Sequence, residues 1–444
     1  MYAYISLLAV ILTYGMETAF FRFYILEPNK KKLFFTSMVS LISTTLLFII
    51  LIYLFIKPIT TIIHIGGHPE IIFWCAFIVS FDAITAIPFA KLRAENRAKK
   101  FALIKVINIL VNVVFNLFFL LLCPWMLKNG YLTDIVNMIY SKNVGVGYIF
   151  ISNLIASVFT ILLLLPDILK TEYKFDFPLL KSMLIYALPL LIFGLAGIVN
   201  ETMDRIFLSY LSPPDIAMRQ VGIYSACYKI TLFMTILIQA FKYAAEPFFF
   251  SQSKEQNAKQ VYADVMNYFV IACSLIFLGI MLYIDIVKYF VDKPYYEGLK
   301  IVPILLLANM FLGIFYNLSV WYKLTNQTKW GAYISIFGAI ITIVLNYSLI
   351  PILGYMGSAW ATLACYASMM VVSYLIGQKK FYIQYCLKNF FVFLTGAIIL
   401  YFISIYIKPE RFLFRMAFNT LLFVGYIALL YFYEFQHKFR SKKV

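Results

Sequence analysis

The sequence predicts an all-α polytopic membrane protein with about 13 transmembrane helices. Of its 444 residues, 63% are hydrophobic and 13% are charged, and the mean hydropathy is +0.87. Soluble globular domains carry about 25% charged residues. Apolar runs of about 18 to 25 residues recur along the whole chain, and each is long enough to cross a hydrocarbon core about 30 Å thick. The alternating pattern of a membrane β-barrel is absent, so the spans are expected to be helices.

The apolar runs leave room for short loops only. The longest loops lie near 123–144 and 285–300, so no separate soluble domain is expected. The first residues, MYAYISLLAV, carry neither a basic segment nor a small-residue cleavage site, which argues against a signal peptide. The expected spans, each bound holding to within several residues, are 2–26, 33–56, 71–90, 102–122, 145–166, 183–208, 221–248, 262–284, 301–322, 331–350, 355–376, 389–407 and 413–433.

The placement of the basic residues predicts the topology and explains the net charge of +17. When the loops are numbered alternately, one side holds 22 of the 37 Lys and Arg residues and the other side holds 10, while 5 lie within spans. By the positive-inside rule, the first side is cytoplasmic, so we expect the C-terminus inside and residue 1 outside. The positive charge is therefore a topology signal, and nucleic acid is not an expected partner.

The metal-ligating residue types form no recognisable site, and no cofactor is expected. The six cysteines fall in or beside spans without a CxxC pair and are interpreted as packing residues. His64 and His68 have helical spacing, but the two glycines between them favour a turn over a metal site.

An internal repeat appears when the chain is shifted on itself by 230 positions. Residues 93–116 then align with residues 323–346. Both segments run from a basic cytoplasmic loop into a span, the fourth and the tenth, so the period is six helices. An even period predicts two halves of the same orientation, as in parallel-repeat transporters. The matched pairs are Arg93 with Lys323, Asn96 with Asn326, Lys99 with Lys329, Ala102 with Ala332, Ile104 with Ile334, Val114 with Val344, and Asn116 with Asn346.

The repeat predicts two pseudo-symmetric lobes. The loop 171–182 is interpreted as the linker, so span ten becomes the fifth helix of its lobe and span four should be the fifth of the first lobe. One helix is then expected before residue 1. The expected parts are an N-terminal lobe of five helices (1–170), a cytoplasmic linker (171–182), a C-terminal lobe of six helices (183–376), two additional helices (387–433) and a basic cytoplasmic tail (434–444).

An ordered set of motifs covers nearly the whole chain. It resembles the polysaccharide-biosynthesis oligosaccharide flippases, members of the superfamily of multidrug, oligosaccharidyl-lipid and polysaccharide exporters. The motifs are TYGMETAFFRFY (13–24), DAITAIPFAKLRAENRAKKFALIK (82–105), NETMDRIFLSYL (200–211), GIYSACYK (222–229), QAFKYAAEPFFFS (239–251) and GYMGSAWATL (354–363). The resemblance implies about fourteen helices in two six-helix lobes plus a pair, in a bacterial inner membrane. This sequence departs from it by lacking the first helix, either through a truncated or misassigned start or as a shortened variant.

Charged residues at membrane depth are costly, about 2.5 to 3.5 kcal/mol each on insertion scales, so each suggests a function. Arg22 lies near the cytoplasmic end of its span, where it either snorkels to the interface or lines a cavity. Glu17 lies deeper and is turned about 140° from Arg22 around the helix, so its partner should be another helix or water. Asp82 lies mid-span, where bonding to Ser80 or Thr85 is the structural alternative. Lys105, close to its basic loop, is expected to snorkel.

Two further groups of charges lie in spans six and seven. Glu201 and Arg205 have i,i+4 spacing and are expected to pair, which leaves Asp204 to face another helix or water. Lys229 lies about two turns into span seven, and Lys242 and Glu246 form another i,i+4 pair there. For both pairs, a purely structural ion pair is the alternative interpretation.

The resemblance implies a substrate whose chemistry fits these charges. A lipid-linked oligosaccharide carries a diphosphate, which needs cations in a low-dielectric cavity. Arg22, Arg205 and Lys229 are the candidate diphosphate contacts. Glu17, Asp82, Glu201 and Asp204 are candidates to bind a coupling cation, Na⁺ or H⁺, or to neutralise the cavity between cycles.

The sequence leaves four function classes in order of preference, and neither of the first two is an enzyme. The first is a flippase of polyprenyl-diphosphate-linked oligosaccharide that works by alternating access. The second is a cation-coupled multidrug exporter of the same superfamily, which the intramembrane Arg and Lys residues disfavour. The third is a membrane glycan polymerase or ligase, which would need a large outer loop that the sequence lacks. The fourth and weakest is a channel, for which no re-entrant filter motif is visible.

Overall fold

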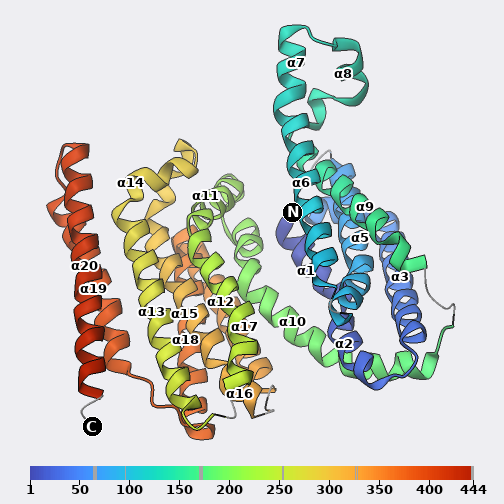
Figure 1. The fold of residues 1–444 in the computed structure, drawn as a ribbon. Coiled ribbons are helices and arrows are strands. Elements are labelled where there is room, and N and C mark those ends of the chain that lie inside the picture. The colour runs from blue at the N-terminus through green and yellow to red at the C-terminus, as the bar shows by residue number, and fades with distance from the viewer. Residues whose placement is uncertain are drawn as a thin grey trace. The chain divides into compact units, whose positions relative to one another are not determined.

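The computed structural model describes residues 1–63, 68–95, 97–169, 174–252, 255–325, 327 and 329–441, and every regular element in these ranges is helical (Figure 1). Twelve of the described helices are long and apolar enough to cross a membrane, and a bent pair raises the number to 13. The expected fold class is therefore confirmed. The chain divides into two compact units, residues 1–198 and 199–444.

Unit 1 is built on four packed helices, in which α6 packs on α9, α9 on α5, and α5 on α3, while α2 contacts both α3 and α5. Its elements are α1 (Tyr2–Thr13), α2 (Met16–Leu26), α3 (Lys30–Leu54), α4 (Ile56–Ile62), α5 (Pro69–Ala94), α6 (Ala98–Leu117), a π-turn (Phe118–Leu122), α7 (Cys123–Asn129), α8 (Thr133–Ile139), a 3₁₀ segment (Lys142–Gly147), α9 (Tyr148–Leu169) and the first part of α10 (Phe177–Leu211).

The first expected span of unit 1 is broken in its middle. Tyr14 (φ 32°) and Gly15 (φ 73°) take left-handed backbone conformations between α1 and α2. A β-carbon on Gly15 would lie 2.7 Å from the carbonyl oxygen of Ala187 on α10. A side chain there would meet both the left-handed strain and this contact, so the break requires glycine. It places Glu17 in the first turn of α2.

Helix ends in unit 1 follow local sequence signals. The side chain of Asn29 accepts a hydrogen bond from the backbone N–H of Lys32 (2.9 Å) and so caps α3. Pro69 begins α5, where its missing N–H costs nothing. Gly130, in a left-handed conformation (φ 72°), ends α7.

Unit 2 repeats the same packing order, because α17 packs on α18, α18 on α15, and α15 on α13, while α12 contacts both α13 and α15. Its elements are the end of α10, α11 (Ala217–Ile230), α12 (Leu232–Gln252), α13 (Ala258–Leu282), α14 (Ile284–Val287), two 3₁₀ segments (Lys288–Phe290 and Lys293–Ile301), α15 (Val302–Leu318), α16 (Val320–Leu324), α17 (Lys329–Leu353), α18 (Tyr355–Lys380), α19 (Leu387–Ile407) and α20 (Phe412–Ser441).

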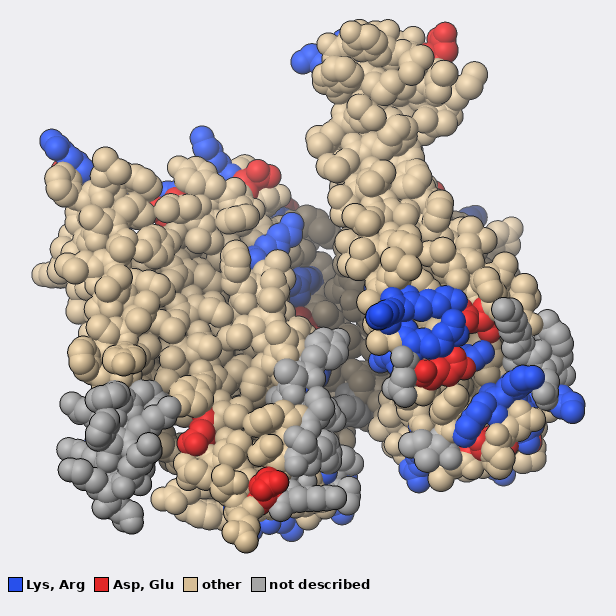
Figure 2. All heavy atoms as spheres, viewed as in Figure 1, with Lys and Arg blue, Asp and Glu red and all other residues tan. Residues whose placement is uncertain are grey.

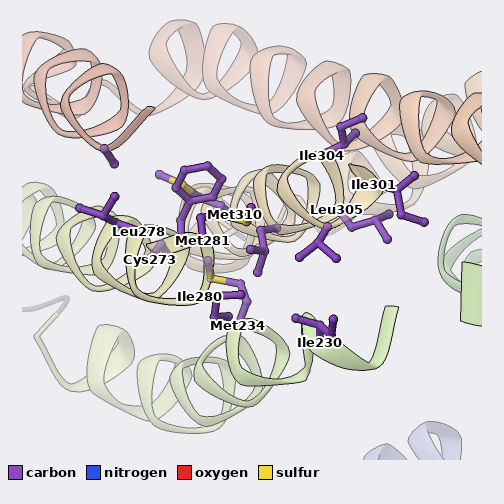
Figure 3. Close-up of a cluster of buried hydrophobic side chains, with 14 of the residues drawn as sticks. Ile230, Met234, Cys273, Leu278, Ile280, Met281, Ile301, Ile304, Leu305 and Met310 are labelled. Carbon is purple, nitrogen blue, oxygen red and sulfur yellow. The ribbon is translucent and has the colours of Figure 1, made fainter. Parts of the chain in front are cut away.

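The core of unit 2 lies between α11, α12, α13 and α15. Buried side chains such as Met234, Cys273, Leu305 and Met310 interdigitate there (Figure 3). Lipid tails are as apolar as these side chains, so dispersion and shape fit hold such a core within a membrane. The span formed by α11 and α12 bends by 57° at Thr231.

Polar contacts join α20 to α13, α14 and α19 within unit 2. Arg415 on α20 pairs with Asp285 (3.0 Å), and Asn419 Nδ2 donates to the carbonyl oxygen of Leu282. The Tyr426 hydroxyl donates to the carbonyl oxygen of Phe393 on α19 (2.7 Å). These bonds satisfy polar groups that lipid could not.

The shared packing order gives the sequence repeat a structural counterpart. In the 230-residue alignment, α6 corresponds to α17, and the matched pairs that the structure describes are helical in both units. Asn96 and Asn326 lie outside the described residues. The division between units falls inside α10, at residue 198, and not in the expected linker 171–182, of which residues 177–182 belong to α10. The expected domain bounds stay a prediction.

Candidate functional site

Asp204, on α10, is the most completely enclosed of the predicted site carboxylates. Its residue is 1% exposed, and its side chain accepts three hydrogen bonds. The Tyr224 hydroxyl (2.7 Å) and the Thr362 hydroxyl (3.1 Å) donate to Oδ2, and Asn346 Nδ2 (3.3 Å) donates to Oδ1. The donors come from α11, α17 and α18, so Asp204 joins four helices of unit 2.

A second layer of polar groups surrounds this carboxylate. Asn200, one turn before Asp204 on α10, donates to the carbonyl oxygen of Ser335 (3.1 Å) and accepts from the Thr342 hydroxyl (3.1 Å). Ser358 donates to Asn346 Oδ1 (2.9 Å). All these residues are buried. Such a connected network is stable in a low-dielectric interior only while each member keeps its partner.

The Asp204 cluster, defined as Asn200, Asp204, Tyr224, Thr342, Asn346, Ser358 and Thr362, offers a specific chemistry. It combines one carboxylate with hydroxyl and amide oxygens, which are the ligands that hard cations prefer. A proton on Asp204 is the other way to neutralise the buried charge. Among the described residues, no group of three His, Cys, Asp or Glu side chains could hold a metal ion.

Arg205 lies beside this cluster and departs from its expected pairing. Its guanidinium stands over the ring of Tyr228, 4.7 Å from the centroid, and over that of Tyr224, at 5.6 Å. Instead of closing an ion pair with the Glu201 carboxylate, it contacts the Glu201 backbone carbonyl oxygen (3.4 Å). The i,i+4 ion pair expected from the sequence is therefore wrong, because two aromatic faces compete for the guanidinium.

The other predicted residues of unit 2 are more exposed. Glu201 accepts a hydrogen bond from the Tyr316 hydroxyl (3.3 Å), and the Lys242 ammonium lies 4.6 Å from the centroid of the same ring. Lys229 is exposed on α11. The side chain of Glu246 lies outside the described residues, so its expected pairing with Lys242 stays a prediction.

Glu17 and Arg22 separate in unit 1, as their angular spacing requires. Glu17 pairs with Arg93 near the end of α5. Arg22 is exposed, and its guanidinium lies 4.2 Å from the centroid of Tyr186 on α10. Each unit thus holds one predicted arginine over a tyrosine ring.

Asp82 lies on α5 and is exposed within unit 1. Its carboxylate accepts a hydrogen bond from Ser157 on α9 (2.9 Å), whereas the sequence pointed to Ser80 or Thr85; Thr85 bonds instead to the backbone of Asp82. Lys105 is within electrostatic range of Asp82, and its ammonium stands 4.3 Å from the centroid of Phe89. Lys105 itself is exposed, and its expected snorkelling stays a prediction.

Asp167 was missed from the sequence. It is 7% exposed and pairs with Arg97 (2.9 Å) and Lys100, while Lys91 donates to its backbone carbonyl oxygen (3.4 Å). Figure 2 shows basic and acidic side chains gathered at one end of unit 1. Asp167 raises the pKa of Arg97 by hydrogen bonding. The sequence did contain a signal for this pairing. Asp167 directly follows Pro166 at the end of a span, on the side of the membrane where the basic loops lie.

Of the two histidines, His68 contacts Glu70 (2.8 Å), and His64 lies outside the described residues with both intervening glycines.

The fold of this chain is that of transporters of the multidrug, oligosaccharidyl-lipid and polysaccharide exporter superfamily. A lipid II flippase, MurJ, in an inward closed conformation, is 17% identical over 97% of this chain and 92% of its own, with a TM-score of 0.67. An inward-facing multidrug resistance MATE transporter is 14% identical over 85% of this chain and 87% of its own, also with a TM-score of 0.67. A superfamily transporter from Pyrococcus furiosus is 14% identical over 85% of each chain, with 0.60.

These likenesses establish the fold alone at such low identity. No protein-family model matches the sequence, and no curated protein matches it.

Proposed function

We propose that this chain is a membrane transporter that flips a lipid-linked oligosaccharide carrying a diphosphate across the bacterial inner membrane by alternating access, for surface polysaccharide synthesis. The observation that carries the proposal is the adjacency of Arg205 to the Asp204 cluster. A cation at membrane depth lies beside a buried carboxylate, and Tyr224 contacts both. The MurJ likeness supports the substrate class, since that protein is a flippase of lipid II.

The proposed substrate site uses the predicted cations. Arg205, Arg22 and Lys229 would bind diphosphate oxygens through charge-assisted hydrogen bonds, which strengthen where water is excluded. The tyrosine rings beneath Arg205 and Arg22 hold each guanidinium without neutralising it, because a ring contributes no formal charge. Both guanidinium groups are therefore left with charge for an anion.

The proposed coupling site is Asp204. Rotation of the Thr362 hydroxyl and of the Asn346 amide would turn donors into oxygen ligands for Na⁺, or a proton would neutralise the carboxylate directly. Glu201 and Asp82, both exposed, would balance cavity charge, and Glu17 would hold Arg93. We place the C-terminus in the cytoplasm, as the basic loops indicate.

The proposal is tested with purified protein in proteoliposomes. The substrate is a fluorescent polyprenyl-diphosphate oligosaccharide, and its exposure to an external quencher is followed over time. Arg22→Ala, Arg205→Ala and Lys229→Ala together should slow transport at least tenfold, whereas Lys323→Ala with Lys329→Ala, outside the proposed site, should leave it within twofold. Full transport by the triple variant would overturn the cationic site.

A multidrug exporter is the second candidate, and one observation favours it. Asp82 keeps an exposed carboxylate within a span, which suits a cationic drug. The same proteoliposomes loaded with ethidium distinguish the two functions. Ethidium transport that depends on Asp82 and is unaffected by the three alanine substitutions would favour the exporter.

A further inference from the structure

A cavity of about 220 Å³ lies within unit 2, between α13, α15, α18 and α19, and closes against the loop that joins α18 to α19. Its walls are mostly apolar, with Met266 and Val270 on α13, Ile314 on α15, Val371 on α18 and Phe390 on α19. Drug-sized ligands occupy about 300–1,000 Å³. A narrow apolar chain therefore fits this space better than a bulky group.

Polar groups occur at one end of the cavity. Asn267, Tyr374 and Tyr385 line it, and Asn389 beside them donates to Asn267 Oδ1 (3.2 Å). The same loop carries exposed Cys386. An occupant is therefore apolar along most of its length and meets polar atoms near the loop 381–386.

Positive charge collects at that same end. Lys379 and Lys380 close α18, Lys388 opens α19, and the Lys259 ammonium lies 5.0 Å from the centroid of Phe381 in the connecting loop. Lys379, Lys380 and Lys388 are exposed. Asp264, next to the lining residue Ala263, contributes a negative charge and is bonded by Gln260 (2.9 Å). Four cations against one carboxylate favour an anionic headgroup.

We propose that this cavity binds one acyl chain of an anionic phospholipid, whose phosphate lies against Lys379, Lys380 and Lys388. Apolar chains gain contact by filling a groove that packed helices leave open, and each basic residue near a membrane surface contributes attraction for an anionic headgroup. The lipid is a bound constituent of unit 2 that fills the space between α19 and the packed helices, and it is not the transported substrate. This site is independent of the proposed flippase activity.

A native cysteine, Cys386, can report whether the cavity is occupied. Cys386 is the exposed cysteine and lines the cavity, whereas Cys75, Cys123, Cys227, Cys273 and Cys365 are buried. Alkylation of Cys386 by N-ethylmaleimide is measured by peptide mass spectrometry in micelles with added dioleoylphosphatidylglycerol or dioleoylphosphatidylcholine. The phosphatidylglycerol should slow alkylation at least fivefold, and the phosphatidylcholine should slow it less than twofold. Equal rates with both lipids would overturn the proposal.

Variants test the two halves of the site separately by native mass spectrometry of retained phosphatidylglycerol. Ala263→Phe and Val371→Trp each fill the cavity and should reduce retained lipid about tenfold. Ile399→Phe, at an exposed position of α19 outside the lining, is the matched control and should retain it. If Ala263→Phe and Val371→Trp both retained as much lipid as Ile399→Phe, the acyl chain would not lie in this cavity.

The headgroup is tested by charge removal. Lys379→Gln, Lys380→Gln and Lys388→Gln together should abolish the preference for phosphatidylglycerol over phosphatidylcholine, whereas Lys323→Gln with Lys329→Gln should preserve it. An unchanged preference in the first variant would show that these cations do not bind the phosphate.

Discussion

The two units share a packing order but treat one matched residue differently. Asn346 of unit 2 is fully buried and donates to Asp204, and its own amide oxygen accepts from Ser358. Asn116, its partner in the repeat, is only partly buried and donates to Asn112 on the same helix, at 2.9 Å to the backbone oxygen and 2.6 Å to the side chain. Both amides donate to the backbone oxygen four residues earlier on their own helix, Asn346 to Thr342 at 2.8 Å and Asn116 to Asn112 at 2.9 Å, but Asn346 also donates to a carboxylate on another helix.

The difference comes from what lies against each helix. In unit 2, α10 brings Asn200 and Asp204 against α17 and α18. In unit 1, the described contacts of α6 include Asn108 with Thr160 on α9 (2.9 Å), a neutral pair. The repeat therefore preserves packing positions, while the described partners of the matched amides differ by one buried carboxylate, Asp204.

The largest expected effect tests whether unit 2 alone holds the coupling site. Asp204→Asn keeps the shape of the side chain but removes its charge and its capacity to accept at both oxygens. We expect gradient-driven transport to fall about 100-fold, roughly 2.7 kcal/mol in barrier. The initial rate in proteoliposomes under a Na⁺ or a proton gradient measures it.

Asp82→Asn is the matched change in unit 1, and we expect its rate to stay within about threefold. A larger loss for Asp82→Asn than for Asp204→Asn would assign the coupling site to the other unit.

A smaller effect sharpens the contrast between the matched amides. Asn346→Ala leaves Asp204 and Ser358 each short of a partner, and such buried losses cost about 1 to 3 kcal/mol. Asn116→Ala removes a bond made within its own helix at a partly exposed position, so we expect about 0.5 kcal/mol or less. The free energy of unfolding by sodium dodecyl sulfate, followed by circular dichroism, measures both. Equal losses would show that the burial of Asn346 has no energetic consequence.

The smallest expected effect concerns the start of α10 in unit 1. A hydrogen bond from Lys32, assisted by the backbone N–H of Leu179, lowers the pKa of Asp176. A carboxyl whose folded pKa is lowered stabilises the fold above its unfolded pKa of about 3.9, and this contribution is lost as pH falls through the lower folded value.

Asp176→Asn should therefore flatten the loss of thermal stability between about pH 5 and pH 3, and Lys32→Gln should flatten it in part. Melting temperatures across that range measure the effect. A wild-type slope retained in Asp176→Asn would show that other groups cause it.

The fold could be predicted from the sequence because length and hydropathy alone define a spanning helix. The repeat further predicted a shared architecture, since α6 and α17 carry matched residues at the same packing positions. The break at Tyr14 and Gly15 and the bend at Thr231 could not be read in this way. Hydropathy stays high through both, and the close approach of Ala187 to Gly15 comes from a helix far along the chain.

The candidate site was predictable in residue type but not in partnership. A carboxylate within a span needs hydrogen-bond partners. The sequence near Asp204 did not indicate that these would be Asn346 and Thr362, which lie 142 and 158 positions away. Arg205 shows the opposite error, because i,i+4 spacing suggested Glu201 while two tyrosine rings one helix away provided the contact. Spacing along one helix indicates which side chains can pair within that helix. Which contact a side chain actually makes depends on the helices packed against it.

The pairing of Glu17 with Arg93 has a consequence for how the protein is made. The two residues are 76 positions apart, so the ribosome completes the first span well before it reaches the partner of Glu17. At about 5 to 20 residues per second, the carboxylate waits roughly 4 to 15 seconds before Arg93 is synthesised. An unpaired carboxylate at membrane depth costs about 2.5 to 3.5 kcal/mol. We therefore expect Glu17 to stay near water or within the insertion machinery until α5 is made.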